Sequence, residues 1–308
     1  MTEDFKSIFD SYIKAGKAVI AAKKLAREIS VPGTSYLEIA EKCEEKIINN
    51  GANLAFPINM SLNEQAAHYS PPIDDETVVP ESGLLKIDLG SHVDGFIADS
   101  AFTINLDEAP KLQTYIDAAN QALEAAISLF KPGTKLYELG EAIDQSIKKF
   151  GLNPIKNLGG HKLKQNNLHA GEFIPNYKAT QHDEVLMPGD AYACEPFSTS
   201  GVGFVENGKI SYIYRFEKKI TKNMGYEEKN YVNKIEKVCS RLPFSPRLLL
   251  SKNVIPKSKI KNIINSFLRK GILEHYPILI ERSKAPVAQQ EHTIIIDMDG
   301  NTHVTTME

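Results

Sequence analysis

Two aspartates that could share a cation lie on the two arms of a predicted β-hairpin. Residues 84–90 are strand-like, Asp94-Gly95 is a strong signal for a tight turn, and residues 96–99 begin a return strand. Asp88 lies in the first arm and Asp99 in the second. On the core side of a sheet, two unpaired carboxylates repel each other and are poorly solvated, so protons, basic groups or metal must neutralise them. The alternative for this hairpin alone is that one aspartate merely caps a turn.

The register of this hairpin predicts how the two carboxylates face each other. If Val93 lies opposite Phe96, Asp99 lies opposite Gly90, two residues from Asp88 and on the same side of the pleat. Such diagonal neighbours lie about 7–8 Å apart at the backbone, and their side chains can converge further. Gly90 has no side chain and leaves space between them. At this separation the carboxylates of Asp88 and Asp99 could ligate a shared cation.

More residues of metal-ligand type occur farther along the chain. Glu195 follows an apolar strand-like segment, and Glu291 precedes another. His161 follows two glycines in a loop-like context, and His169 comes eight residues later. Taken singly, each of these residues is more often a turn residue or a satisfied polar group than a ligand.

An internal repeat predicts how the chain brings these residues together. Residues 31–51 recur without a gap at 131–151, and the two copies share Pro32/Pro132, Gly33/Gly133, Thr34/Thr134, Glu38/Glu138, Glu41/Glu141, Ile47/Ile147 and Gly51/Gly151. Each copy follows an alanine-rich amphipathic helix and reads as a Pro-Gly break, a polar cap, a second helix and a glycine stop.

The similarity continues more faintly beyond these helices. A histidine follows in each copy, His68 and then His169, and each is followed by a DE-x-x-x-P segment, at residues 75–80 and 183–188. We therefore expect two helix-helix-strand-strand units related by a pseudo-twofold axis, with Asp88 and Glu195 on opposing strands of one sheet. Chance similarity of two helices is the alternative, but it leaves the ordered matches unexplained.

At this point the chain resembles a known family, the methionine aminopeptidases, and in particular their type II branch. The segments that carry the resemblance span almost the whole chain in family order: FPINMSLNEQAAHYSP, KIDLGSHVDGFIADSAFT, NLGGHKLKQNNLHAG, ACEPFSTSGVG and AQQEHTIII. The resemblance implies an α+β pita-bread fold, in which duplicated helix-strand units surround a curved antiparallel sheet. This agrees with the repeat.

The resemblance also implies two divalent metal ions. Asp88 would be a terminal ligand of one metal, His161 and Glu195 terminal ligands of the other, and Asp99 with Glu291 would bridge them. Four carboxylates offset the charge of two dications, which supports this set. Oxygen-rich ligation with one imidazole suits Mn, Fe, Co or Zn, and the sequence does not choose among them.

The implied activity is removal of the N-terminal methionine from nascent proteins and peptides, with a preference for a small second residue. The family pattern assigns His68 and His169 to contacts with the peptide and the reaction intermediate, and Glu195 to proton transfer. Phe56 and Leu168 are the predicted walls of the methionine pocket. The alternatives are an Xaa-Pro aminopeptidase or prolidase-like enzyme, and a non-catalytic pita-bread binding module.

The 95 residues between Glu195 and Glu291 resemble the type II insertion. From 217 to 284 the chain holds 16 Lys plus Arg and 6 Asp plus Glu, whereas the remainder is acidic. We predict a catalytic domain of residues 1–215 and 285–308 and a basic helical insertion at 216–284, with a winged-helix-like pattern. Ribosome or RNA contact is one interpretation of its charge, and a solvated lysine-rich face is the other.

The composition limits the remaining classes. With 308 residues and 42% apolar content, the chain can build a sizeable core. It has no apolar run long enough to span a membrane, its first 30 residues lack a secretion-signal pattern, and its three cysteines lack metal-finger spacing. We therefore expect a cytoplasmic protein without a membrane partner, and the resemblance suggests a monomer.

Overall fold

The computed structural model describes residues 3–217 and 224–308 of the chain. The first half contains α1 (Glu3–Ile29), α2 (Tyr36–Asn49), β1 (Asn53–Leu54), β2 (Asn59–Leu62), β3 (Gln65–Ala67), β4 (Leu84–Val93) and β5 (Phe96–Asn105). The second half contains α3 (Pro110–Ser128), α4 (Leu136–Lys148), β6 (Asn153–Pro154), β7 (Gly159–Leu163), β8 (Phe173–Pro175), β9 (Ala191–Cys194) and β10 (Phe197–Thr199).

The rest of the chain leaves these two halves and then returns to them. It forms β11 (Val205–Phe216), α5 (Tyr226–Cys239), α6 (Pro246–Ser251), α7 (Lys257–Arg269), β12 (Leu273–Glu281), β13 (Val287–Gln289), β14 (His292–Ile296) and β15 (Thr302–Val304). No helix in the described ranges is long and apolar enough to cross a bilayer.

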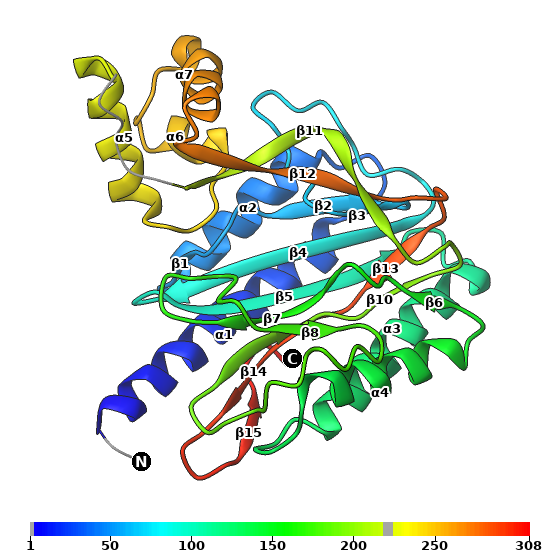
Figure 1. The fold of residues 1–308 in the computed structure, drawn as a ribbon. Coiled ribbons are helices and arrows are strands. Elements are labelled where there is room, and N and C mark those ends of the chain that lie inside the picture. The colour runs from blue at the N-terminus through cyan, green and yellow to red at the C-terminus, as the bar shows by residue number, and fades with distance from the viewer. Residues whose placement is uncertain (1–2, 218–223) are drawn as a thin grey trace.

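Curved antiparallel strands occupy the middle of the molecule, and the helix pairs cover them (Figure 1). Helix α1 packs against β4 and β5, and α3 packs against β10 and β13. Each helix pair buries its own apolar cluster, one around Ile39 and Phe102 and the other around Ile143 and Tyr192. The predicted α+β architecture of duplicated units around curved antiparallel strands is confirmed. The expectation of one shared sheet is wrong, because β4, which carries Asp88, and β9, which precedes Glu195, belong to different sheets.

The predicted hairpin and its register are also confirmed. Val93 pairs with Phe96 and Gly90 with Asp99 in the β4–β5 ladder. Asp94 and Gly95 have φ values of 53° and 85°, the two positive values that a type I′ turn requires. The turn chemistry therefore fixes the relation between the two strands that carry Asp88 and Asp99.

The repeat extends into matching backbone hydrogen bonds. The N–H of Gly33 donates to the carbonyl of Val79 (2.8 Å), and the N–H of Gly133 donates to the carbonyl of Leu186 (2.9 Å). Val79 therefore corresponds to Leu186. The DE-x-x-x-P alignment pairs Val79 with Met187 instead, so the true equivalence is shifted by one residue.

The same shift brings the two central acids into equivalent places. In the first half, Leu54 of β1 pairs with the residue three positions after Asp88. In the second half, Pro154 of β6 pairs with the residue three positions after Glu195. The pseudo-twofold relation of the halves thus superposes Asp88 on Glu195, as the sequence repeat predicts.

The helices between β11 and β12 form a separate cluster at one end of the molecule (Figure 1). They bury their own apolar core, which includes Ile235, Phe244, Leu249 and Phe267. The two long strands that lead to and from them pair with each other, and β12 also pairs with β3 of the first half. This pairing attaches the helical part to the strands beside the predicted site.

Candidate metal centre

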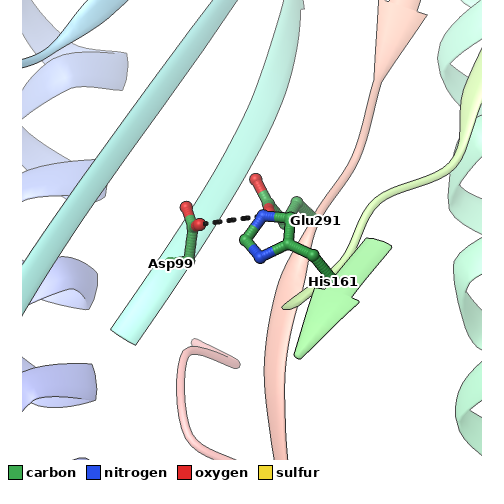
Figure 2. A group of neighbouring side chains, drawn as sticks. All are labelled: Asp99, His161 and Glu291. Carbon is green, nitrogen blue, oxygen red and sulfur yellow. Dashed lines mark ion pairs between the residues drawn. The ribbon is translucent and has the colours of Figure 1, made fainter. Parts of the chain in front are cut away.

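All five predicted metal-ligating side chains line one cavity of about 210 Å³. Asp88 comes from β4, Asp99 from β5 and His161 from β7, while Glu195 follows β9 and Glu291 precedes β14. Segments from both halves of the repeat and from the end of the chain therefore meet at one place. Figure 2 shows Asp99, His161 and Glu291 directed toward one another from different segments of the chain.

The distances are those of a group that could hold cations. Ligand atoms of Asp99, His161 and Glu291 all lie within 4.8 Å of one another. The Nε2 atom of His161 is 3.6 Å from an oxygen of Asp99 and 3.9 Å from an oxygen of Glu195. The imidazole thus faces two carboxylates from opposite halves of the molecule.

The acids stand in an environment that disfavours their charge. Asp99 and Glu291 are 3% and 2% exposed. Burial raises the pKa of Asp88 to about 7. Burial, and then the neighbouring carboxylates, raise the pKa values of Asp99, Glu195 and Glu291 well above their ordinary range. Burial lowers the pKa of His161 to about 4, so its imidazole is neutral at physiological pH and free to ligate.

The chemistry of this donor set fits divalent cations. One oxygen of Asp88 and one of Asp99 are buried without a hydrogen-bond partner. Within residues 3–217 and 224–308, no Lys or Arg forms an ion pair with any of the four carboxylates. Unpaired buried charge is costly, and two dications would neutralise four carboxylates. Asp88, Asp99, His161, Glu195 and Glu291 are therefore the residues that would hold metal.

The two predicted catalytic histidines also line the cavity. Nδ1 of His68 lies 3.1 Å from the carbonyl of Pro277 and must donate to it, so Nε2 of the neutral ring is a hydrogen-bond acceptor. Burial lowers the pKa of His68 to about 4, which keeps this ring neutral. His169 lies on the open side of the cavity, with its ring 4.4 Å from that of His161.

The predicted pocket walls lie where an apolar side chain could be held. Phe56 and Leu168 line the cavity and are 5% and 7% exposed. The Phe56 ring covers Gly90, where an added Cβ would lie 2.2 Å from a ring carbon. The sequence analysis expected open space at Gly90 between the two aspartates. This expectation is wrong, because the Phe56 ring fills that space.

Several cavity residues were not predicted from the sequence. Tyr276 of β12 contacts both histidines, packing edge-on against His68 at 5.5 Å and stacked on His169 at 6.1 Å between ring centroids. Pro243, from the loop after α5, also lines the cavity. Both residues belong to the predicted insertion. The insertion reaches the site through contacts between segments that are far apart in the sequence, which sequence patterns do not reveal. The only sequence signal for the position of Tyr276 in the cavity is its aromatic side chain, which lies next to Pro277.

A duplicated fold that closes four carboxylates and an imidazole between its halves defines a class of protein built to bind divalent cations. Residues 10–232 match the model of metallopeptidase family M24, and the chain belongs to this family, which uses divalent metals. The chain is 42% identical over 297 residues to a methionine aminopeptidase of Pyrococcus horikoshii, covering 96% of this chain and 99% of that one. It is 42% identical over 305 residues to that of Saccharolobus solfataricus, covering 97% of each.

Solved structures show the same fold at low sequence identity. A thermophilic Arx1 has a TM-score of 0.85 at 17% identity, covering 99% of this chain and 91% of that one. A methionine aminopeptidase of Thermotoga maritima has a TM-score of 0.71 at 21% identity, covering 100% and 98%. A prolidase of Pyrococcus furiosus has a TM-score of 0.62 at 16% identity, covering 100% of this chain and 65% of that one. These likenesses confirm the pita-bread fold.

Proposed function

We propose that this protein removes the N-terminal methionine from nascent proteins and peptides, with a preference for a small second residue. The observation that carries this proposal is the convergence of five ligand side chains in one buried cavity beside an apolar wall. Relatives at 42% identity that carry the name methionine aminopeptidase support it. Both observations also support a metalloaminopeptidase over a non-catalytic module, because every expected ligand is present.

Two divalent cations bound by these residues would supply an activated water and polarise the scissile carbonyl. Asp88 would ligate one cation, His161 and Glu195 the other, and Asp99 with Glu291 both. Mn, Fe, Co and Zn are all compatible with this donor set. An arrangement that holds the free amine of a substrate fixes the first peptide bond at the centre, so internal bonds are excluded by geometry.

The remaining side chains have roles that follow from their surroundings. Phe56 and Leu168 would bury the methionine side chain, which contributes about 1.5–3 kcal/mol. The accepting Nε2 of His68 suits a peptide N–H, and that ring could donate to an oxyanion only when protonated. His169, at the open side, would contact the peptide, and Glu195 would carry a proton from the attacking water to the leaving amine.

Peptide cleavage tests this proposal against its alternatives. Protein loaded with Mn²⁺ or Co²⁺ is incubated with Met-Ala-Ser, with the same peptide acetylated at its amine, and with Ala-Pro. Free methionine released from the first peptide alone supports the proposal. Cleavage of Ala-Pro alone would select the prolidase-like alternative. Absence of cleavage with every metal would select the binding module.

We further propose that the basic insertion, residues 216–284, contacts RNA when nascent chains emerge from the ribosome. Its excess of positive charge supports this, although Lys257 and Lys259 form ion pairs with Asp74 and Glu227. Lys234, Lys237 and Lys261 are exposed and have no ion-pair partner in the described part of the chain. A Lys234→Gln, Lys237→Gln, Lys261→Gln variant should therefore bind ribosomes more weakly than wild type. Unchanged affinity would contradict RNA contact.

We also propose that the protein is a monomer in the cytoplasm, which the resemblance to methionine aminopeptidases supports. Light scattering coupled to size exclusion should give a mass near 34.2 kDa. A mass of twice this value would contradict the monomer.

A further inference from the structure

The pseudo-twofold relation of the halves places a neutral amide where the first half has an acid. In the first half, Asp99 pairs with the residue two positions after Asp88. In the second half, Gln289 pairs with the residue two positions after Glu195. Gln289 is therefore the structural counterpart of Asp99, although nothing in the repeated sequence segments relates the two residues.

The side chain of Gln289 has a single well-defined contact in the cavity region. Its Nε2 donates to Oε2 of Glu195 over 3.1 Å, and the residue is 1% exposed. Its backbone is held on both sides by Thr103, whose Oγ1 accepts from the Gln289 N–H (2.9 Å) and donates to the Gln289 carbonyl (2.7 Å). The amide is thus fixed in position before any cation binds.

This hydrogen bond gives the two carboxylate oxygens of Glu195 different neighbours. Oε2 accepts from Gln289, whereas Oε1 faces Nε2 of His161 at 3.9 Å. An amide can hold one oxygen without adding charge to the cluster. A carboxylate at position 289 would be a fifth acid beside four, and it could not donate to an ionised Glu195.

We propose that Gln289 is a positioning residue that fixes the Glu195 carboxylate so that Oε1 remains free to ligate a cation. This inference rests on the proposed metal centre. Hydrogen-bonded partners of metal ligands typically change metal affinity by about 10- to 100-fold when they are removed. Gln289 differs from the five ligands in that it contributes no atom to the cation and acts through Glu195.

The experiment compares two neighbouring glutamines. Gln289→Met keeps the length of the side chain and removes its donor, and Gln290→Met is the matched control. Gln290 is 8% exposed and lines a different cavity, with Arg27 and Asn105. Metal-free full-length protein is titrated with Mn²⁺ in a calorimeter, and its melting temperature without metal is measured. We expect Gln289→Met to weaken one Mn²⁺ site by about 10- to 100-fold, while Gln290→Met matches wild type.

The outcomes separate this inference from the proposed function. Wild-type protein that binds no Mn²⁺ would overturn the metal centre itself. Wild-type protein that binds Mn²⁺ with an isotherm shared by Gln289→Met would overturn only the role of Gln289. If Gln289→Met does not fold, Gln289→Leu replaces it, because an aliphatic side chain of similar size has no donor and adds no charge to the cluster. Weaker Mn²⁺ binding by that variant supports the inference, and equal or tighter binding overturns it.

Discussion

The two halves of the molecule supply their acids by different routes. In the first half, one continuous hairpin carries both Asp88 and Asp99, and a two-residue turn sets their relation. In the second half, Glu195 and Glu291 are adjacent only because β9 and β14 pair, with the whole insertion between them in sequence. A symmetric scaffold thus holds one pair of ligands through local structure and the other through long-range pairing.

The halves also differ in their single imidazole. His161 lies on β7, opposite the residue two positions before Glu195. Its counterpart on β2 is Ser61, opposite the residue two positions before Asp88. Duplication therefore built two similar frames, and one histidine makes the two cation positions chemically unequal.

Removing one acid from each half should have the largest effect. Asp99→Asn and Glu291→Gln should each lower methionine release from Met-Ala-Ser by about 10³-fold or more, because each would lose a ligand shared by both cations. The metal-free variants should melt at higher temperature than wild type, because each relieves repulsion among buried carboxylates. Rate assays and calorimetry measure the two effects.

Asp94→Asn is the control for this comparison, because it lies in the same hairpin but at the turn, where Asn also tolerates a positive φ. Its activity should match wild type. Full activity in Asp99→Asn together with loss in Glu291→Gln would show that only the second half holds an essential ligand.

The stability that the buried Asp88 carboxylate costs the metal-free protein should grow as pH rises. Burial raises the pKa of Asp88 from 3.8 to about 7. Below about pH 4 the group is protonated in both folded and unfolded states and carries no penalty. The penalty grows from there and is complete above about pH 7, so stability is lost through this window.

Thermal melts of metal-free protein between pH 4 and pH 8 measure this effect, which should amount to about 5 °C. The effect is the difference in melting temperature between Asp88→Asn and wild type, because the buried His68 and His161, whose lowered pKa values act in the opposite direction, are common to both proteins. Added Mn²⁺ should stabilise wild type most above pH 7. A difference that stays constant or shrinks as pH rises over this range would contradict the raised pKa of Asp88.

An intermediate effect should follow from adding a methyl group at Gly90, next to the Phe56 ring. In Gly90→Ala, the new methyl group would meet the Phe56 ring at 2.2 Å, so the ring must move into the cavity. We expect a loss of about 1–3 kcal/mol in stability and about tenfold in kcat/KM. Phe56→Leu in the same chain should recover part of the stability. Additive losses in the double variant would show that the two residues do not compete for space.

The smallest effect should come from the helix starts, where the halves also differ. Oγ of Ser35 accepts from the N–H of Glu38 in α2, whereas in α4 the carboxylate of Glu138 accepts from the N–H of Lys135. Ser35→Ala should therefore cost about 0.5–1 kcal/mol and Lys135→Ala almost nothing. Urea unfolding curves measure the two losses in free energy of unfolding. Equal losses would show that the two helix starts are stabilised to the same extent by these side chains.

Sequence alone could predict what local chemistry determines. The hairpin register followed from Asp94-Gly95, and the two helix pairs followed from the repeat. The one-residue shift that makes Leu186 the counterpart of Val79 could not be found in this way, because residue types in a loop do not fix the path of its backbone. The roles of Tyr276 and Gln289 depend on contacts between distant segments, and neither local periodicity nor composition carries that information.

The order of ligands along the chain determines when the centre can form during synthesis. Asp88, Asp99, His161 and Glu195 all precede the insertion, and Glu291 follows it. Strand β14, which places the segment after Glu291 beside β9, is made later still. A ribosome that has just completed the insertion therefore carries a chain with three of its four acids, and an enzyme proposed to trim emerging chains cannot assemble its own cation site until its last strands have emerged.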